Sequence, residues 1–365
     1  MRPERKVCQV QNAETLLGII RDRGKRGLPL KRVHPLLYNP DLYLLAYARL
    51  YANKGAMTPG ATRETVDGMN RVKIDRLIDE LRHERFRWTP VRRAHIPKKT
   101  GKLRPLGLPT WTDKLLQEVM RSILDAYFEP QFSAHSHGFR PNRGCHTALS
   151  GVQRGWTGVK WFIEGDVKGC FDNISHEILL RVLGDKIHDN RFLQLVRRLL
   201  QAGYLEDWRY GATLSGTPQG GVLSPLLSNA YLNELDQFVE QELLPAYNRG
   251  ARRRPHPRYE TLLQHAQRLR RCGRKEEAQA VYGLVRKLPS QDMADPTYRR
   301  LQYVRYADDW LLGFAGPKAE AEEIKDRLQS FLRDHLKLEL SSEKTLITHA
   351  GDKALPRLRD QQHAC

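Results

Sequence analysis

Apolar residues recur every three or four positions along much of the chain, a spacing typical of amphipathic helices. The clearest pattern runs over residues 112–128, and Pro130 ends it. The same spacing predicts helices over residues 13–23, 72–84, 175–187, 190–202, 224–247 and 317–336. Short runs rich in apolar and aromatic residues predict strands over residues 91–97, 161–167, 338–340 and 345–348. The chain therefore combines long helices with short strands.

Two adjacent carboxylates, Asp308 and Asp309, lie between two short apolar and aromatic runs in residues 304–314. This arrangement predicts a β-hairpin with the acids at its tip. Neighbouring side chains of a regular strand point to opposite faces, so both acids serve one site only if the backbone turns there. A third acid, Asp166, ends the apolar strand 161–167. We expect Asp166 to face Asp308 across adjacent strands.

The charge balance is strongly basic. Lys and Arg number 61 against 42 Asp and Glu, so the formal net charge is +19 over 365 residues. Such an excess attracts polyanions, and nucleic acid is the partner that it favours. The alternative is a solvated basic surface that serves solubility alone.

The five cysteines are scattered, with no C-x-x-C spacing. An odd, scattered set favours a reducing compartment and gives no framework for structural zinc. No apolar run approaches the roughly 20 residues of a membrane span. We therefore expect a cytoplasmic protein that does not engage a membrane.

Six short blocks carry a resemblance to a known family. They include Gly-Ala-Met-Thr-Pro-Gly at 55–60, Ile-Pro-Lys-Lys-Thr-Gly-Lys-Leu-Arg-Pro-Leu-Gly at 96–107, His-Gly-Phe-Arg-Pro at 137–141, the Asp166 block, Gly-Thr-Pro-Gln-Gly-Gly-Val-Leu-Ser-Pro at 216–225, and the Tyr306 block. In content and order they resemble the reverse transcriptase/maturase proteins encoded by group II introns. A lone Tyr-x-Asp-Asp would be a weak signal, whereas six blocks in family order are specific.

The resemblance implies an α+β fold with the fingers and palm of a right-hand polymerase and an antiparallel palm sheet. It implies an N-terminal extension over residues 1–37, fingers with a template-contacting segment over 38–158, and a palm over 159–350. The palm includes a basic helical insertion at 249–290, and an irregular tail follows at 351–365. The helical thumb and maturase region of the family would follow the palm, so we expect a chain truncated before the thumb.

The resemblance also implies a two-metal site. Asp166, Asp308 and Asp309 would be the catalytic acids, and together with the carbonyl of Val167 they would hold two Mg²⁺ ions. Polymerase sites of this kind need acids that bridge two metal ions about 3.5–4 Å apart. One ion would activate the primer 3′-hydroxyl and the other would neutralise the leaving pyrophosphate.

Five further residues would contact the nucleotide. Lys98 and Arg104 would grip the triphosphate of the incoming dNTP, because an anionic leaving group needs fixed positive charge. Phe171 would stack beneath the sugar and select dNTP over NTP. Gln219 would contact the sugar or base. Lys344 would lie near the pyrophosphate as a candidate general acid.

Candidate RNA contacts come from arginines. Arg140 and Arg143 lie in a polar, Gly-rich loop and are candidate phosphate ligands. Arg252, Arg253 and Arg254 open the insertion, where residues 249–275 contain ten Lys or Arg and one acid. Residues 259–271 and 275–287 predict a helical hairpin, which we interpret as an RNA-binding appendage; a merely solvated hairpin is the alternative.

The function implied is RNA-directed DNA polymerisation for a group II intron, with binding of the intron RNA for splicing and retrohoming. The partners would be the intron RNA template, a DNA primer and dNTPs, in a cytoplasmic ribonucleoprotein of a bacterium. Two alternatives remain open, an RNA-binding splicing cofactor and an inactive truncated remnant. The sequence leaves the oligomeric state undetermined.

Overall fold

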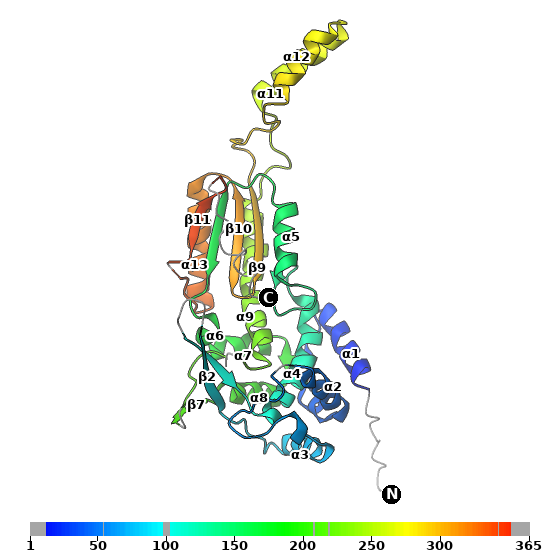
Figure 1. Cartoon of the computed structure of the whole chain (residues 1–365), viewed down its shortest axis with the longest axis vertical. Coiled ribbons are helices and arrows are strands. Elements are labelled where there is room, and N and C mark those ends of the chain that lie inside the picture. The colour runs from blue at the N-terminus through cyan, green and yellow to red at the C-terminus, as the bar shows by residue number, and fades with distance from the viewer. Residues whose placement is uncertain are drawn as a thin grey trace. The chain divides into compact units, whose positions relative to one another are not determined.

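The computed structural model describes residues 12–53, 55–97, 103–206, 209–217, 220–341 and 343–351, without the side chain of Arg104 (Figure 1). The chain forms two compact units. The first comprises Met1–Gly144, Val167–Asp236 and Phe331–Leu340, and the second comprises Cys145–Asp166, Gln237–Ser330 and Ser341–Cys365. Helices and strands occur in both, so the α+β class is confirmed. None of the described helices is long and apolar enough to cross a membrane.

The first unit is mainly helical. Its helices are α1 (Ala13–Lys25), α2 (Pro40–Tyr51), α3 (Arg71–Arg82), α4 (Trp111–Phe128), α6 (Cys170–Asn173), α7 (His176–Gly184), α8 (Asn190–Leu200) and most of α9 (Ser224–Phe238). Helix α4 is its centre, because α1 and α2 both pack on it and its apolar residues are fully buried. The Thr110 hydroxyl accepts a hydrogen bond from the Asp113 N–H and caps α4. The helix predicted over residues 112–128 is thereby confirmed.

A small mixed sheet belongs to the first unit. Its strands β2 (Val91–Pro97), β3 (Leu103–Leu108), β7 (Tyr204–Glu206) and β8 (Arg209–Gly211) lie in the order β3-β2-β7-β8. Strands β2 and β3 are antiparallel, and Pro97 is paired with Leu103. The strand predicted over residues 91–97 is confirmed.

The second unit contains an antiparallel sheet. Strands β11 (Leu346–His349), β5 (Trp161–Asp166), β10 (Asp309–Ala315) and β9 (Arg300–Tyr306) are hydrogen-bonded in that order. Helix α5 (Cys145–Gly155) lies beside β9 in Figure 1 and packs on one sheet face through Ala148, Val304 and Leu311. Helix α13 (Lys318–His335) follows β10.

The predicted insertion is a helical hairpin. Helices α11 (Pro257–Arg271) and α12 (Lys275–Val285) pack against each other through Ala266, Leu269, Ala278 and Val285. Figure 1 shows the hairpin beyond the ends of β9 and β10. At its base the Asp295 carboxylate accepts hydrogen bonds from the Arg254 and Thr297 N–H groups. These bonds lower the pKa of Asp295 to about 2, so the carboxylate stays ionised at neutral pH.

Three predicted elements differ from the structure. The helix predicted over 175–187 stops at Gly184, and Ile187–His188 form strand β6, which pairs with β1 (Leu30–Lys31). The long helix predicted over 224–247 contains a π-helical turn at Val239–Leu243 before α10 (Leu244–Tyr247). Residues 338–340 form no strand, because Leu340 makes only one isolated bridge, to Val167. In the first case the pairing of β6 with β1, two segments far apart in the sequence, replaces the end of the predicted helix.

Candidate active site

Two carboxylates occupy paired positions in the antiparallel sheet. Asp309, the first residue of β10, lies opposite Asp166, the last residue of β5. Directly opposed residues of an antiparallel pair project from the same face, with Cβ atoms about 4.5–5.5 Å apart. Sequence analysis predicted Asp308 in this position, and that prediction was wrong. The register decides the pairing, and it places Asp308 in the turn that precedes β10.

The turn before β10 is short. Tyr306 pairs with Asp309, so only Ala307 and Asp308 connect the strands, as the predicted hairpin requires. Ala307 has φ +54, in the left-handed region that non-glycine residues rarely adopt. The fully buried Arg305 donates from Nη1 to the Ala307 carbonyl at 2.7 Å. Arg305 therefore holds the strained turn and, with it, the adjacent acids.

Sequence analysis did not select Arg305. One signal was available, since a charged residue stands between Val304 and Tyr306 in the short apolar and aromatic run that precedes the acids. A buried charge must be compensated by hydrogen bonds, so it usually has a structural or functional task.

Gly165 explains how β5 and β10 come together beside the acids. It pairs with Trp310, and a Cβ atom at position 165 would overlap the Trp310 indole. Trp310 is buried on the sheet face opposite to Asp309, because adjacent strand residues alternate between faces. The Trp310 indole therefore packs on one face of the sheet, while the Asp166 and Asp309 carboxylates project from the other face.

Lys344 lies at the predicted acid site. Its Nζ is 2.8 Å from Oδ2 of Asp166, and its side chain is about half exposed. The Ser341 carbonyl accepts hydrogen bonds from the N–H groups of Lys344 and Thr345, and the Ser341 N–H donates to the carbonyl of Asp166. This turn ties Lys344 to the end of β5.

The donor set suits a hard cation, since Mg²⁺ prefers carboxylate and carbonyl oxygens. The Asp166 carboxylate already accepts a hydrogen bond from one cationic group, the Lys344 ammonium. Within the described residues, no group of three or more His, Cys, Asp or Glu side chains is close enough to hold a metal ion. The structure thus brings together a pair of acids, with Asp308 next to them in the chain.

The predicted nucleotide contacts are only partly described. Lys98 and Gln219 lie outside the described residues, and the side chain of Arg104 does too, although its backbone belongs to β3. Phe171 is half-buried in α6, and the Thr217 N–H donates to its carbonyl at 2.7 Å. A cavity of about 430 Å³ in the first unit is lined by this Gly216-Thr217 loop together with residues of β2, β3 and β7.

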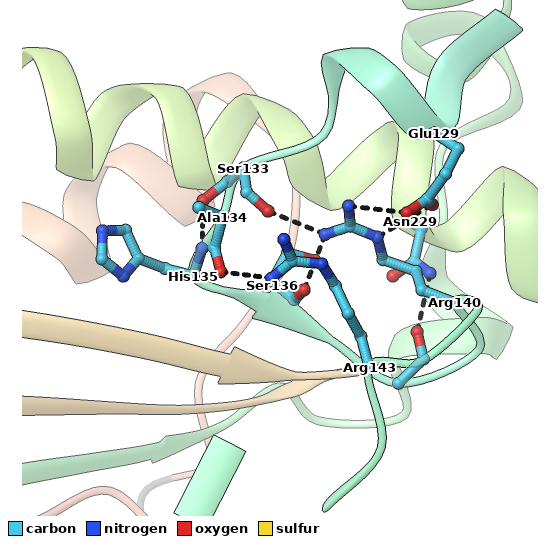
Figure 2. Close-up of polar contacts among 9 residues, drawn as sticks. Glu129, Ser133, Ala134, His135, Ser136, Arg140, Arg143 and Asn229 are labelled. Atoms are coloured by element: carbon cyan, nitrogen blue, oxygen red, sulfur yellow. Dashed lines mark hydrogen bonds and ion pairs between the residues drawn. The ribbon is translucent and has the colours of Figure 1, made fainter. Parts of the chain in front are cut away.

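The prediction that Arg140 contacts phosphate was wrong. Its side chain is 3% exposed and pairs through Nε and Nη2 with both carboxylate oxygens of Glu129 at 3.0 Å (Figure 2). Its Nη1 donates to the carbonyls of Ser133 and Ser136. Because its guanidinium donors are engaged in these bonds, Arg140 fastens the loop from within. Arg143 also donates inward, to the Ala134 carbonyl at 2.7 Å, but remains half-exposed.

The three arginines at the base of the insertion, Arg252, Arg253 and Arg254, differ in their exposure to solvent. Arg253 is half-buried, donates to the Gly158 carbonyl at 2.6 Å and stacks on Tyr298. The predicted RNA contact therefore does not fit Arg253, whose guanidinium ties the insertion to its own unit. Arg252 and Arg254 are exposed.

Comparison with known proteins gives the class. Residues 96–363 match the family described as reverse transcriptase (RNA-dependent DNA polymerase). The match covers more than half of the chain, which therefore belongs to this family. Members of the family generally use divalent metal ions.

Individual relatives are similar over most of the chain. Group II intron-encoded protein LtrA of Lactococcus lactis subsp. cremoris is 46% identical over 331 residues, covering 88% of this chain and 55% of LtrA. The putative COX1/OXI3 intron 1 protein of Saccharomyces cerevisiae is 40% identical, covering 87% of this chain and 38% of that protein. Protein YkfC of Escherichia coli K12 is 34% identical, and the match covers 89% of this chain and 81% of YkfC. The chain thus spans about half of LtrA and less of the yeast protein.

Proposed function

We propose that this chain is an RNA-directed DNA polymerase associated with a group II intron, transferring nucleotides from dNTPs to a primer 3′-hydroxyl on an RNA template. The observation that carries the proposal is the pairing of Asp166 with Asp309 on one sheet face, with Asp308 in the adjoining turn. Membership of the reverse transcriptase family and 46% identity to a group II intron-encoded protein support it.

Asp166, Asp308, Asp309 and the Val167 carbonyl would hold two Mg²⁺ ions. Bound there, the ions would supply charge neutralisation at the phosphates and a lowered pKa at the 3′-hydroxyl. The chain's own task is to fix the carboxylates, which the paired register and the Arg305 clamp achieve. Lys344 would protonate the leaving pyrophosphate, and its ion pair with Asp166 supports a place beside the reacting phosphates.

The nucleotide would be held by residues of the fingers, 38–158, and of the palm, 159–350. Lys98, which follows β2 in the chain, and Arg104, which belongs to β3, would contact the triphosphate. Phe171 would exclude the ribose 2′-hydroxyl, and Gln219 would contact the sugar or base. The cavity beside Gly216 and Thr217 supports a nucleotide site in this region.

Primer extension on an RNA template with a DNA primer, dNTPs and Mg²⁺ tests the proposal. We expect extension by the unaltered chain and a loss of about 10³-fold or more in the Asp309→Asn variant, because the ions would lose one of the carboxylates proposed to hold them. Glu322→Gln, an exposed change on α13, is the matched acid control. An unaltered chain that does not extend, or an Asp309→Asn variant that extends normally, would refute the assignment.

Intron RNA is the proposed partner of the α11–α12 hairpin. Arg258, Arg268, Arg270 and Arg271 are exposed on α11, and basic side chains of this kind bind phosphates without reading sequence. This observation also favours the second candidate function, an RNA-binding splicing cofactor. Retained RNA binding by an Asp309→Asn variant that cannot extend a primer would show that binding is separable from catalysis.

We propose a cytoplasmic setting for the same complex. The five cysteines are scattered along the sequence with no C-x-x-C spacing, which supports a reducing compartment.

A further inference from the structure

Phe139 is a large aromatic residue held in an unfavourable backbone conformation. Its φ is +57, directly after Gly138 with φ +86, and the residue is 58% exposed. Bulky side chains seldom adopt positive φ, and such residues persist only where the surrounding structure imposes them. Because the ring is mostly exposed, burial of the ring does not explain the unfavourable φ of Phe139. The contacts that hold the backbone in this conformation therefore indicate what the residue does.

The residues before and after Phe139 are both held in place. On one side the Asn229 amide, buried on α9, donates to the Gly138 carbonyl at 3.0 Å, and the Gly138 N–H donates to the Arg143 carbonyl. On the other side Arg140 is clamped by Glu129 and two backbone carbonyls (Figure 2). The buried arginine that was predicted to bind phosphate thus holds the loop that carries Phe139.

Phe139 meets Phe171 edge to face. The ring centroids are 6.2 Å apart and the planes cross at 84°, a geometry that the aromatic quadrupole favours. The backbone of Phe171 is fixed independently, by the Thr217 N–H and by the close approach of Gly216, where a Cβ atom would lie 2.7 Å from the Phe171 carbonyl oxygen. The backbone of Phe171 is thereby set, and the contact with Phe139 limits the swing of its ring.

We propose that Phe139 is a positioning residue that braces Phe171 and so sets the discrimination between deoxyribonucleotides and ribonucleotides. The inference rests on the proposed polymerase activity. A single hydroxyl is rejected sterically only if the ring that meets it cannot yield, and a ring open on one side can rotate away. The strained loop, which Arg140 and Asn229 hold in place, positions Phe139 against the Phe171 ring and closes the side toward which that ring could rotate.

The experiment measures kcat/KM for dNTP and for NTP incorporation by the unaltered chain, Phe139→Ala, Phe171→Ala and the double variant. We expect Phe139→Ala to lower the dNTP/NTP ratio about five- to tenfold, which is what an aromatic pair contact contributes. The change should appear mainly as faster NTP use, with dNTP use nearly unaltered. The double variant should discriminate no worse than Phe171→Ala alone, because Phe139 acts through Phe171.

Two further variants keep the result interpretable. Phe331→Ala removes another half-buried aromatic of the first unit, one that stacks on His335, and should leave the ratio unchanged. Phe139→Tyr keeps the ring and should retain discrimination. An unaltered ratio in Phe139→Ala, or additive losses in the double variant, would overturn the brace while leaving the polymerase intact. A chain that incorporates neither nucleotide would overturn the inference together with the proposed function.

Discussion

Arg305 shows how one side chain can set the geometry of the acid site. Its guanidinium is completely buried and donates to the carbonyl of Ala307, the residue at φ +54 in the turn. Asp308 and Asp309 follow Ala307 directly, so any relaxation of the turn moves both carboxylates. Arg305 therefore acts on the acids through the backbone.

We predict that Arg305→Met, which keeps much of the volume without the donors, destabilises the chain by about 2–4 kcal/mol, because a buried charge-assisted bond is lost. Primer extension should fall at least about tenfold, since a small misplacement of catalytic groups is costly. Urea denaturation and an extension assay measure the two effects. Arg300→Met, on the same strand but partly exposed, is the control and should cost under about 1 kcal/mol. Equal losses in both variants would contradict a special role for Arg305.

Asp113 makes stability depend on pH. Burial raises the pKa of this carboxyl to about 7, against hydrogen bonds from Thr110 and Thr89 that lower it. The folded state therefore keeps a proton that the unfolded chain loses near pH 4. As pH rises from about 4 to about 7, this group lowers the free energy of unfolding by at most about 4 kcal/mol.

Asp113→Asn should remove that pH dependence. The amide oxygen can still accept the Thr89 N–H, so the variant should lose less stability than the unaltered chain between pH 5 and pH 8. Urea denaturation at the two pH values measures the difference. Asp75→Asn, at an exposed ion pair on α3, should leave the pH profile as it was. A profile that Asp113→Asn does not flatten would show that other groups dominate.

At the scale of elements, the α11–α12 hairpin is an independent attachment. Its helices pack on each other, and the chain enters and leaves at neighbouring positions, because the His256 N–H donates to the Ser290 carbonyl at 3.2 Å. The base is secured below that point by Asp295 and Arg253. The hairpin can therefore be removed without cutting the sheet.

We predict that replacing residues 257–289 by an Asn-Gly turn leaves the thermal midpoint nearly unchanged and weakens RNA binding. Losing about four phosphate contacts should reduce the slope of log K against log salt by about 3 to 4. Filter binding over a salt series measures this slope. A variant that keeps the hairpin but carries Gln for Arg258, Arg268, Arg270 and Arg271 should show a similarly reduced salt slope. Unchanged slopes in both variants would favour a merely solvated hairpin.

At the scale of the whole molecule, the net charge of +19 governs encounter with nucleic acid. We predict that binding of a structured RNA weakens by about 10³-fold or more between 50 and 200 mM salt, as six or more phosphate contacts require. Equilibrium binding at several salt concentrations measures it, with an unrelated RNA of equal length as the competitor. Salt-independent binding would contradict an electrostatic origin.

The amino-acid sequence by itself determined the features that depend on local patterns. The helix at 112–128, the strand at 91–97, the helical hairpin of the insertion and the acidic turn near Asp308 were all predicted. Periodicity, capping and turn residues act over a few neighbouring positions, so they can be interpreted without the fold. The resemblance in six blocks supplied the family, which the family match later established.

Only the tertiary structure decided how distant residues meet. Asp309 rather than Asp308 faces Asp166, because the two-residue turn sets the strand register, and a shift of one residue exchanges the faces. Arg140 is buried because Glu129 and two backbone carbonyls surround it, a set that no spacing in the sequence indicates. Whether a charged side chain binds a ligand or its own fold depends on its neighbours in space, and these are defined only once the chain has packed.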